Sequence, residues 1–162
     1  MKNFLCNGLI AVAGLVSLPG PLAKVQAPLP AAKADIDPRL SILQGFLADI
    51  DSPARALAST FISVADQYRL DWRLLPSISV VESEAGKTAR NNNLFGWANG
   101  RAAFPSLSAG IETVAYYLAN SSMYKNKDLN ALLETYNPQT DYATRVKSVM
   151  QRIAPSKIAE EE

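Results

Sequence analysis

The sequence has no histidine, and its only cysteine, Cys6, lies close to the N-terminus. Histidine is the usual base beside serine and cysteine nucleophiles and a common ligand of catalytic zinc. Its absence therefore excludes Ser-His, Cys-His and His-ligated zinc mechanisms, and we expect neither a metal nor another cofactor. Three possibilities remain: catalysis by carboxylates, catalysis by a Ser-Lys pair, and no catalysis.

The chain also has little net charge, with 16 Lys and Arg against 15 Asp and Glu, a net of +1. Proteins that bind nucleic acid usually carry a basic patch, so we expect no nucleic-acid partner. Of the 162 residues, 48% are hydrophobic and 19% are charged, which predicts one domain with a substantial core plus short extensions.

Residues 1–27 have the pattern of a secretory leader. Lys2 precedes an apolar run from Gly8 to Leu18, which is too short for a comfortable membrane span. The sequence Val25-Gln26-Ala27 then fits a small-x-small cleavage site. We expect export to the periplasm or cell envelope. The alternative is an uncleaved anchor, in which case this segment is the part of the chain that contacts the membrane.

Composition divides the rest of the chain into three parts. Residues 28–36 are rich in Pro and Ala and predict a spacer. Residues 37–154 contain the apolar pattern of one domain, which we expect to be monomeric. Residues 155–162 end in three glutamates and predict a disordered acidic tail.

Apolar residues recur at helical spacing through most of residues 37–154, and the third helix is expected to end near Ser83. From Gly86 to Pro105 this period is replaced by Asn, Gly and aromatic residues, which predict turns and short strands. Helical spacing returns after Ser108. The residues expected to cap helices are Asp37, Ser52, Asp71, Asp128 and Asp141. The predicted fold is α+β and mainly α, a helical domain with one small β-lobe.

The first motif that carries chemistry is Glu82, at the end of the apolar third helix. Val80 and Val81 precede it, and apolar surroundings disfavour a carboxylate, which raises the pKa toward that of a general acid. Such a carboxyl can protonate a glycosidic oxygen near neutral pH. The alternative is a solvated surface residue.

The second motif, Asn-Asn-Leu-Phe-Gly-Trp at residues 92–97, follows this glutamate closely. Sugars present hydroxyl and acetamido groups around flat apolar faces, so a cleft lined by amide side chains and an aromatic ring suits them. The alternative is a turn whose aromatic residues anchor the lobe on the core.

The third motif is Tyr136-Asn137-Pro138, at the expected end of a short helix. A tyrosine there can place its hydroxyl in a cleft, to support a developing charge or to orient a water. The alternative is a tyrosine with its ring in the core and its hydroxyl at the edge.

In this order and spacing the motifs resemble the glucosaminidase family, glycoside hydrolase family 73, also labelled mannosyl-glycoprotein endo-β-N-acetylglucosaminidase-like. The resemblance spans roughly Ala58 to Ile153. It rests on a helix ending in Glu-Ser, an Asn-Asn-x-Phe-Gly segment, Phe-Pro-Ser leading into Ile111-Glu112, and Tyr-Asn-Pro before a final basic helix.

The resemblance implies a lysozyme-like fold and cleavage of the β-1,4 bond after N-acetylglucosamine in peptidoglycan glycan strands. It makes Glu82 the acid and Tyr136 the supporting hydroxyl. It also places Asn93, Phe95 and Gly96 in the glycan-binding wall. With their neighbours in the second and third motifs, the residues that we expect to bind glycan are Asn92, Asn93, Phe95, Gly96, Trp97 and Asn137.

Glycoside hydrolases usually need a second group opposite the acid, but no Asp or Glu occurs from Ala85 to Ile111. The substrate's own N-acetyl group can act as internal nucleophile, and a water held by Tyr136 is the competing arrangement. Two other functions remain open: a non-catalytic glycan-binding or assembly module of the same fold, and a lytic transglycosylase.

Overall fold

The computed structural model describes residues 37–155. The predicted leader (residues 1–27) and spacer (28–36) lie outside the described residues, and so does the predicted acidic tail (155–162) apart from Pro155. Residues 37–155 belong to one compact unit. None of the helices in this range is both long enough and apolar enough to span a membrane.

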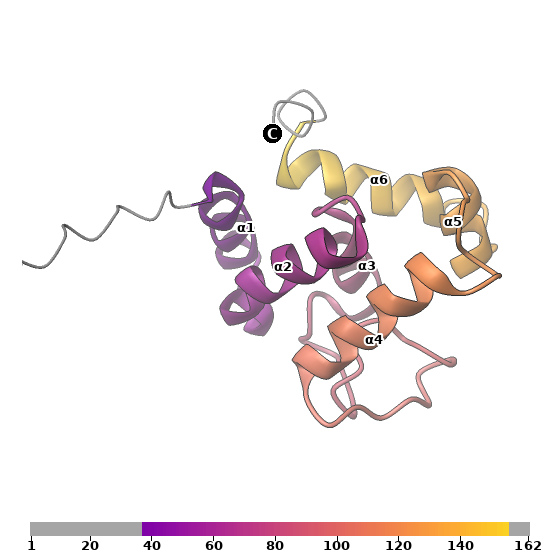
Figure 1. The fold of residues 1–162 in the computed structure, drawn as a ribbon. Coiled ribbons are helices and arrows are strands. Elements are labelled where there is room, and N and C mark those ends of the chain that lie inside the picture. The colour runs from indigo at the N-terminus through magenta and orange to yellow at the C-terminus, as the bar shows by residue number, and fades with distance from the viewer. Residues whose placement is uncertain (1–36, 156–162) are drawn as a thin grey trace, which may run out of the picture. The chain divides into compact units, whose positions relative to one another are not determined.

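The described part of the chain is mainly helical, as the sequence predicts (Figure 1). A short 3-10 helix, η1, accompanies the α-helices. In chain order the elements are α1 (Pro38–Asp49), η1 (Pro53–Leu57), α2 (Ala58–Tyr68), α3 (Leu74–Ser83), α4 (Leu107–Asn120), α5 (Leu129–Tyr136) and α6 (Tyr142–Ile153).

Helix α3 lies at the centre of the core. It packs against α2 and α6, while α4 packs against α2 and α5 against α6 (Figure 1). The N-terminal six residues of α3, Leu74 to Ser79, are all buried, and so is Ser83 in its last turn. A short helix that is buried on nearly every side has apolar residues all round in its sequence, instead of one apolar face and one polar face. This position holds the end of α3, and Glu82 with it, firmly in the molecule.

Three of the expected caps are confirmed. The side chains of Asp37, Ser52 and Asp128 each accept a hydrogen bond from a backbone N–H at the start of a helix. The cap expected at Asp71 is wrong, because Arg73 holds the N-cap position of α3. Asp141 does hold the N-cap position of α6, but its side chain makes no capping hydrogen bond. Asp71 accepts from Arg73 N ahead of α3, and Asp141 instead forms an ion pair with Arg145 one turn along α6.

The lobe, residues 84–106 between α3 and α4, contains no strand within the described residues. A single isolated antiparallel bridge joins Arg90 and Asn93. The expected small β-lobe is therefore not confirmed, and the backbone gives the reason. Positive φ angles interrupt the lobe at Glu84, Ala85, Gly86, Asn91, Asn92, Gly96, Ala98, Asn99 and Gly100. A strand needs consecutive residues in the extended region, and left-handed residues at this density prevent it.

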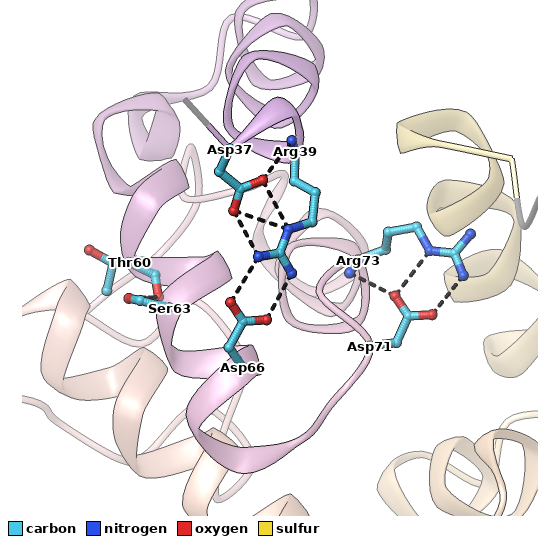
Figure 2. A network of polar contacts seen from close by, with 7 residues as sticks. All are labelled: Asp37, Arg39, Thr60, Ser63, Asp66, Asp71 and Arg73. Carbon is cyan, nitrogen blue, oxygen red and sulfur yellow. Dashed lines mark hydrogen bonds and ion pairs between the residues drawn. The ribbon is translucent and has the colours of Figure 1, made fainter. Parts of the chain in front are cut away.

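Two arginines fix the helices away from the lobe (Figure 2). Arg39 on α1 pairs with Asp37 and, at 2.8 Å, with Asp66 on α2. Arg73 pairs with Asp71 and donates to the carbonyl of Ala154, just after α6, at 2.9 Å. The start of α3 is thus tied to the end of α6, which lets the opposite end of α3 face the lobe.

Candidate active site

A cavity of about 700 Å³ lies where the end of α3 meets the lobe and the end of α5. Six residues that the sequence predicts for the site line it: Glu82, Phe95, Gly96, Trp97, Tyr136 and Asn137. The other lining residues are Ala98, Asn99, Gly100, Tyr124, Pro138 and Gln139. Two predicted residues, Asn92 and Asn93, lie outside this lining. Among the described residues that line the cavity, Glu82 is the one ionisable carboxylate.

Glu82 occupies the last turn of α3 and is partly buried. Burial raises the pKa of its carboxyl above the usual value, while Tyr142 and the positive charge of Arg145 act in the opposite direction. A carboxyl with a raised pKa keeps more of its proton near neutral pH, as a general acid requires. Glu84, two residues on, is exposed and lies in the left-handed turn that ends the helix.

Gly96 lets the lobe approach this carboxyl closely. Its φ is +59°, and a Cβ at this position would lie 2.7 Å from the Glu82 Oε2 atom. Both the backbone angle and the contact favour glycine. Gly96 thus forms the part of the wall directly against the acid, while the side chain of Phe95 before it is buried in the core.

Asn93 holds the lobe together from inside. It is 4% exposed, and its Nδ2 donates to the carbonyls of Trp97 at 3.0 Å and Ala102 at 3.3 Å. Its Oδ1 accepts from the N–H groups of Phe95 at 3.3 Å and Trp97 at 2.9 Å. The geometry therefore favours a supporting role for Asn93 over the direct glycan contact predicted from the sequence.

Asn92 is exposed, and its side chain donates to the carbonyl of Phe104 at 2.8 Å across the lobe. Ser83, directly after the acid, is buried. Its hydroxyl lies 2.8 Å from the carbonyl of Leu94 and accepts from Gly86 N at 3.1 Å. The serine of the Glu-Ser pair therefore anchors the lobe on the end of α3.

Tyr136, at the end of α5, joins that helix to the lobe. Its hydroxyl donates to the carbonyl of Phe95 at 2.6 Å. Burial, with the nearby charge of Glu82, raises the pKa of Tyr136 well above 10, so the phenol keeps its proton. Because the hydroxyl proton is donated to the Phe95 carbonyl, the hydroxyl can act toward the cavity only as an acceptor, through its oxygen.

Tyr142, at the first position of α6, is a further residue beside Glu82, and the sequence analysis missed it. Its ring stacks on that of Tyr136, with centroids 5.9 Å apart and planes 10° from parallel. The hydroxyl is buried and has no hydrogen bond of regular geometry within the described residues. Burial, followed by the proximity of Glu82, raises the pKa of Tyr142 above its usual value. The one sequence feature that could have indicated Tyr142 is an aromatic residue in the first turn of the final helix, six residues after Tyr136.

The Arg145 guanidinium lies 5.7 Å from the centroid of the Tyr142 ring. Its positive charge favours the ionised form of Glu82 and offsets part of the effect of burial, which is the larger of the two, so the pKa of this carboxyl stays raised. A comparison with protein-family models, curated proteins and solved structures found no match for the chain.

Proposed function

We propose that the chain is a peptidoglycan hydrolase that cleaves the β-1,4 bond after N-acetylglucosamine, with Glu82 as the general acid. In this proposal it belongs with the glucosaminidases of glycoside hydrolase family 73 and has a lysozyme-like fold. One observation carries the proposal: a partly buried carboxyl with a raised pKa is the one carboxylate that lines a cavity walled by aromatic and amide side chains.

The wall of the cavity suits an N-acetylated sugar. Trp97 and Tyr124 supply aromatic surface for the flat apolar face of a sugar ring. Asn99, Asn137 and Gln139 supply amide groups that can both donate to and accept from hydroxyl and acetamido groups. The described residues of the wall include no Lys or Arg, which agrees with a neutral ligand.

The proposed reaction begins when protonated Glu82 donates its proton to the glycosidic oxygen. As the bond from the anomeric carbon to that oxygen breaks, the carbonyl oxygen of the substrate's N-acetyl group attacks the anomeric carbon. The sugar leaves as an alcohol, and a bicyclic intermediate forms. Glu82, now a carboxylate, then takes a proton from water as the water opens this intermediate. The reaction needs no second carboxylate, and none lines the described cavity.

The competing mechanism, a water held by Tyr136, is less favoured by the geometry. The hydroxyl of Tyr136 donates to Phe95, so a water could bind only as a donor to the phenol oxygen. In that orientation the phenol does not accept a proton from water, because it remains protonated itself.

The wider setting is also part of the proposal. Peptidoglycan lies outside the cytoplasm, so a substrate of this kind agrees with the secretory leader expected at residues 1–27. Contact with the membrane is then limited to that segment, if it is not cleaved, and the domain acts as a monomer.

The decisive experiment compares the wild-type protein with Glu82→Gln in a peptidoglycan digestion assay. The amide keeps the shape of the side chain but lacks the proton, so the rate should fall by roughly 10²- to 10⁴-fold. Glu84→Gln, the same change at an exposed carboxyl two residues away, is the matched control and should retain the wild-type rate.

Mass spectrometry of the cleaved strands identifies the bond. Reducing N-acetylglucosamine ends support the proposal, whereas anhydro-muramic acid ends identify a lytic transglycosylase, which also needs only one acid. Undiminished turnover in Glu82→Gln overturns the acid assignment. Glycan binding without turnover in the wild type identifies a binding module.

A further inference from the structure

The exposed apolar side chains of the described residues are concentrated in one place. The large hydrophobic residues that are exposed are Tyr116 at 51%, Tyr117 at 44% and Met123 at 59%. The two tyrosines lie on α4, and Met123 follows its end. Single exposed apolar residues are ordinary, but exposed aromatic residues gathered on one element often mark a binding surface.

The two tyrosines are continuous with the wall of the cavity. The ring of Trp97, which lines the cavity, lies 5.7 Å from that of Tyr117, centroid to centroid. Tyr117 in turn lies 5.7 Å from Tyr116, with the rings nearly perpendicular at 80°. We call these three residues, Trp97, Tyr117 and Tyr116, the aromatic track. It leads from the cavity containing Glu82 across the surface of α4 toward α2.

The outer end of the track is held in place. The ring of Tyr116 meets the edge of Tyr68 on α2, with centroids 6.1 Å apart. The hydroxyl of Tyr68 is hydrogen-bonded to the carboxyl of Glu112, one turn before Tyr116 on α4. Rings that are positioned before a ligand arrives lose little conformational entropy on binding.

The residue types around the aromatic track indicate which class of ligand it can bind. Residues 113–124, which contain the tyrosines, and residues 91–100, which contain Trp97, include no charged side chain. Nucleic acid and acidic lipid surfaces are bound largely through Lys and Arg. Aromatic rings and amides within segments that carry no charge instead suit an uncharged polysaccharide, whose sugar rings have apolar faces and hydroxyl edges.

We propose that the aromatic track binds further sugar units of the glycan strand outside the cavity, so that the protein prefers long strands to short fragments. This inference rests on the proposed function, because it takes the strand to enter the cavity at Glu82. Trp97 stacks on the sugar at the mouth of the cavity, and Tyr117 and Tyr116 stack on the units that follow.

The test measures binding separately from turnover. The full chain bearing Glu82→Gln is titrated calorimetrically with N-acetylglucosamine dimers and hexamers, which it should bind without cleaving. Adding Tyr116→Ala should weaken hexamer binding by about tenfold, the loss expected when a stacked ring is removed. Dimer binding should stay the same, because a dimer fills the cavity alone.

Tyr117→Phe keeps the ring and should keep the hexamer affinity, while Tyr117→Ala should weaken it. Met123→Ala is the matched control, since it removes an equally exposed apolar side chain that has no place in the track. Unchanged hexamer binding in Tyr116→Ala overturns the inference. Equal losses for dimer and hexamer, an equal loss in Met123→Ala, or no glycan binding at all also overturn it. Length-dependent binding without turnover in the wild type supports the track and counts only against the proposed catalysis.

Discussion

Glu82 is subject to opposing influences that can be separated one residue at a time. Burial favours its protonated form, while Tyr142 and Arg145 favour the carboxylate. The balance sets the pH range in which the group can donate a proton. A general acid works only below its pKa, so the alkaline limb of the activity profile should follow the pKa of Glu82.

Tyr142→Phe should therefore move that limb to higher pH. The substitution removes the hydroxyl that lowers the pKa of Glu82 but keeps the ring that stacks on Tyr136. The measurement is kcat/KM on peptidoglycan fragments as a function of pH. Arg145→Gln should move the limb in the same direction, because it removes the positive charge. A limb that stays in place or moves to lower pH in Tyr142→Phe would contradict a role for this hydroxyl.

Glu82 and Tyr142 also show which site residues the sequence can reveal. The position of Glu82 follows from its own helix, since an ionisable residue at the end of an apolar run is visible in the chain. The raised direction of its pKa was predicted for the same reason and is confirmed. Tyr142 reaches the acid only because α6 packs against α3, and that contact joins segments 60 residues apart.

At the scale of the elements, prediction succeeded where the signal is local. The caps at Asp37, Ser52 and Asp128 depend on hydrogen bonds that reach two or three residues along the chain. The conformation of the lobe could not be predicted from its sequence, because Asn, Gly and aromatic residues favour both tight hairpins and series of turns. Its conformation is set by Asn93 and by contact with α3 and α5, which the local pattern does not encode.

Asn93→Ala tests whether this side chain supports the lobe or binds glycan. Removal of an amide that makes four hydrogen bonds should reduce the free energy of unfolding by about 2–3 kcal/mol, measured by urea denaturation. Glycan affinity should fall as well, because Trp97 loses two of its anchors.

Asn92→Ala is the matched control for this lobe asparagine. It removes one exposed hydrogen bond to Phe104 and places alanine at a positive φ, so it should cost about 1 kcal/mol, less than Asn93→Ala. If Asn93→Ala keeps wild-type stability but loses glycan affinity, the side chain binds the glycan directly, as the sequence analysis expected.

At the scale of the whole molecule, the site is assembled from segments that are distant in the chain. Glu82 comes from α3, Trp97 from the lobe, Tyr124 from the turn after α4 and Tyr136 from α5. Arg73 fixes the far end of α3 on α6. The mainly helical architecture could be read from apolar spacing. The convergence of these segments could not, because it depends on how the helices pack together.

The stability of the whole molecule should also depend on Glu82. A carboxyl whose pKa is raised by folding binds its proton more tightly in the folded state than in the unfolded state. This contribution to stability is fully present below the ordinary pKa of 4.5 and is lost as the pH rises through the higher folded value. At neutral pH the ionised carboxylate in its partly buried site therefore opposes folding.

Glu82→Gln removes this penalty because the amide is uncharged at every pH. The variant should melt at the same temperature as the wild type near pH 4 and at an equal or higher temperature at pH 8, measured by calorimetry across that range. Glu84→Gln, at an exposed carboxyl, controls for the loss of one surface charge. A lower melting temperature for Glu82→Gln at pH 8 would mean that the carboxylate stabilises the fold. That result would identify Glu82 as a structural residue, since a catalytic acid held at a raised pKa costs stability in its ionised form.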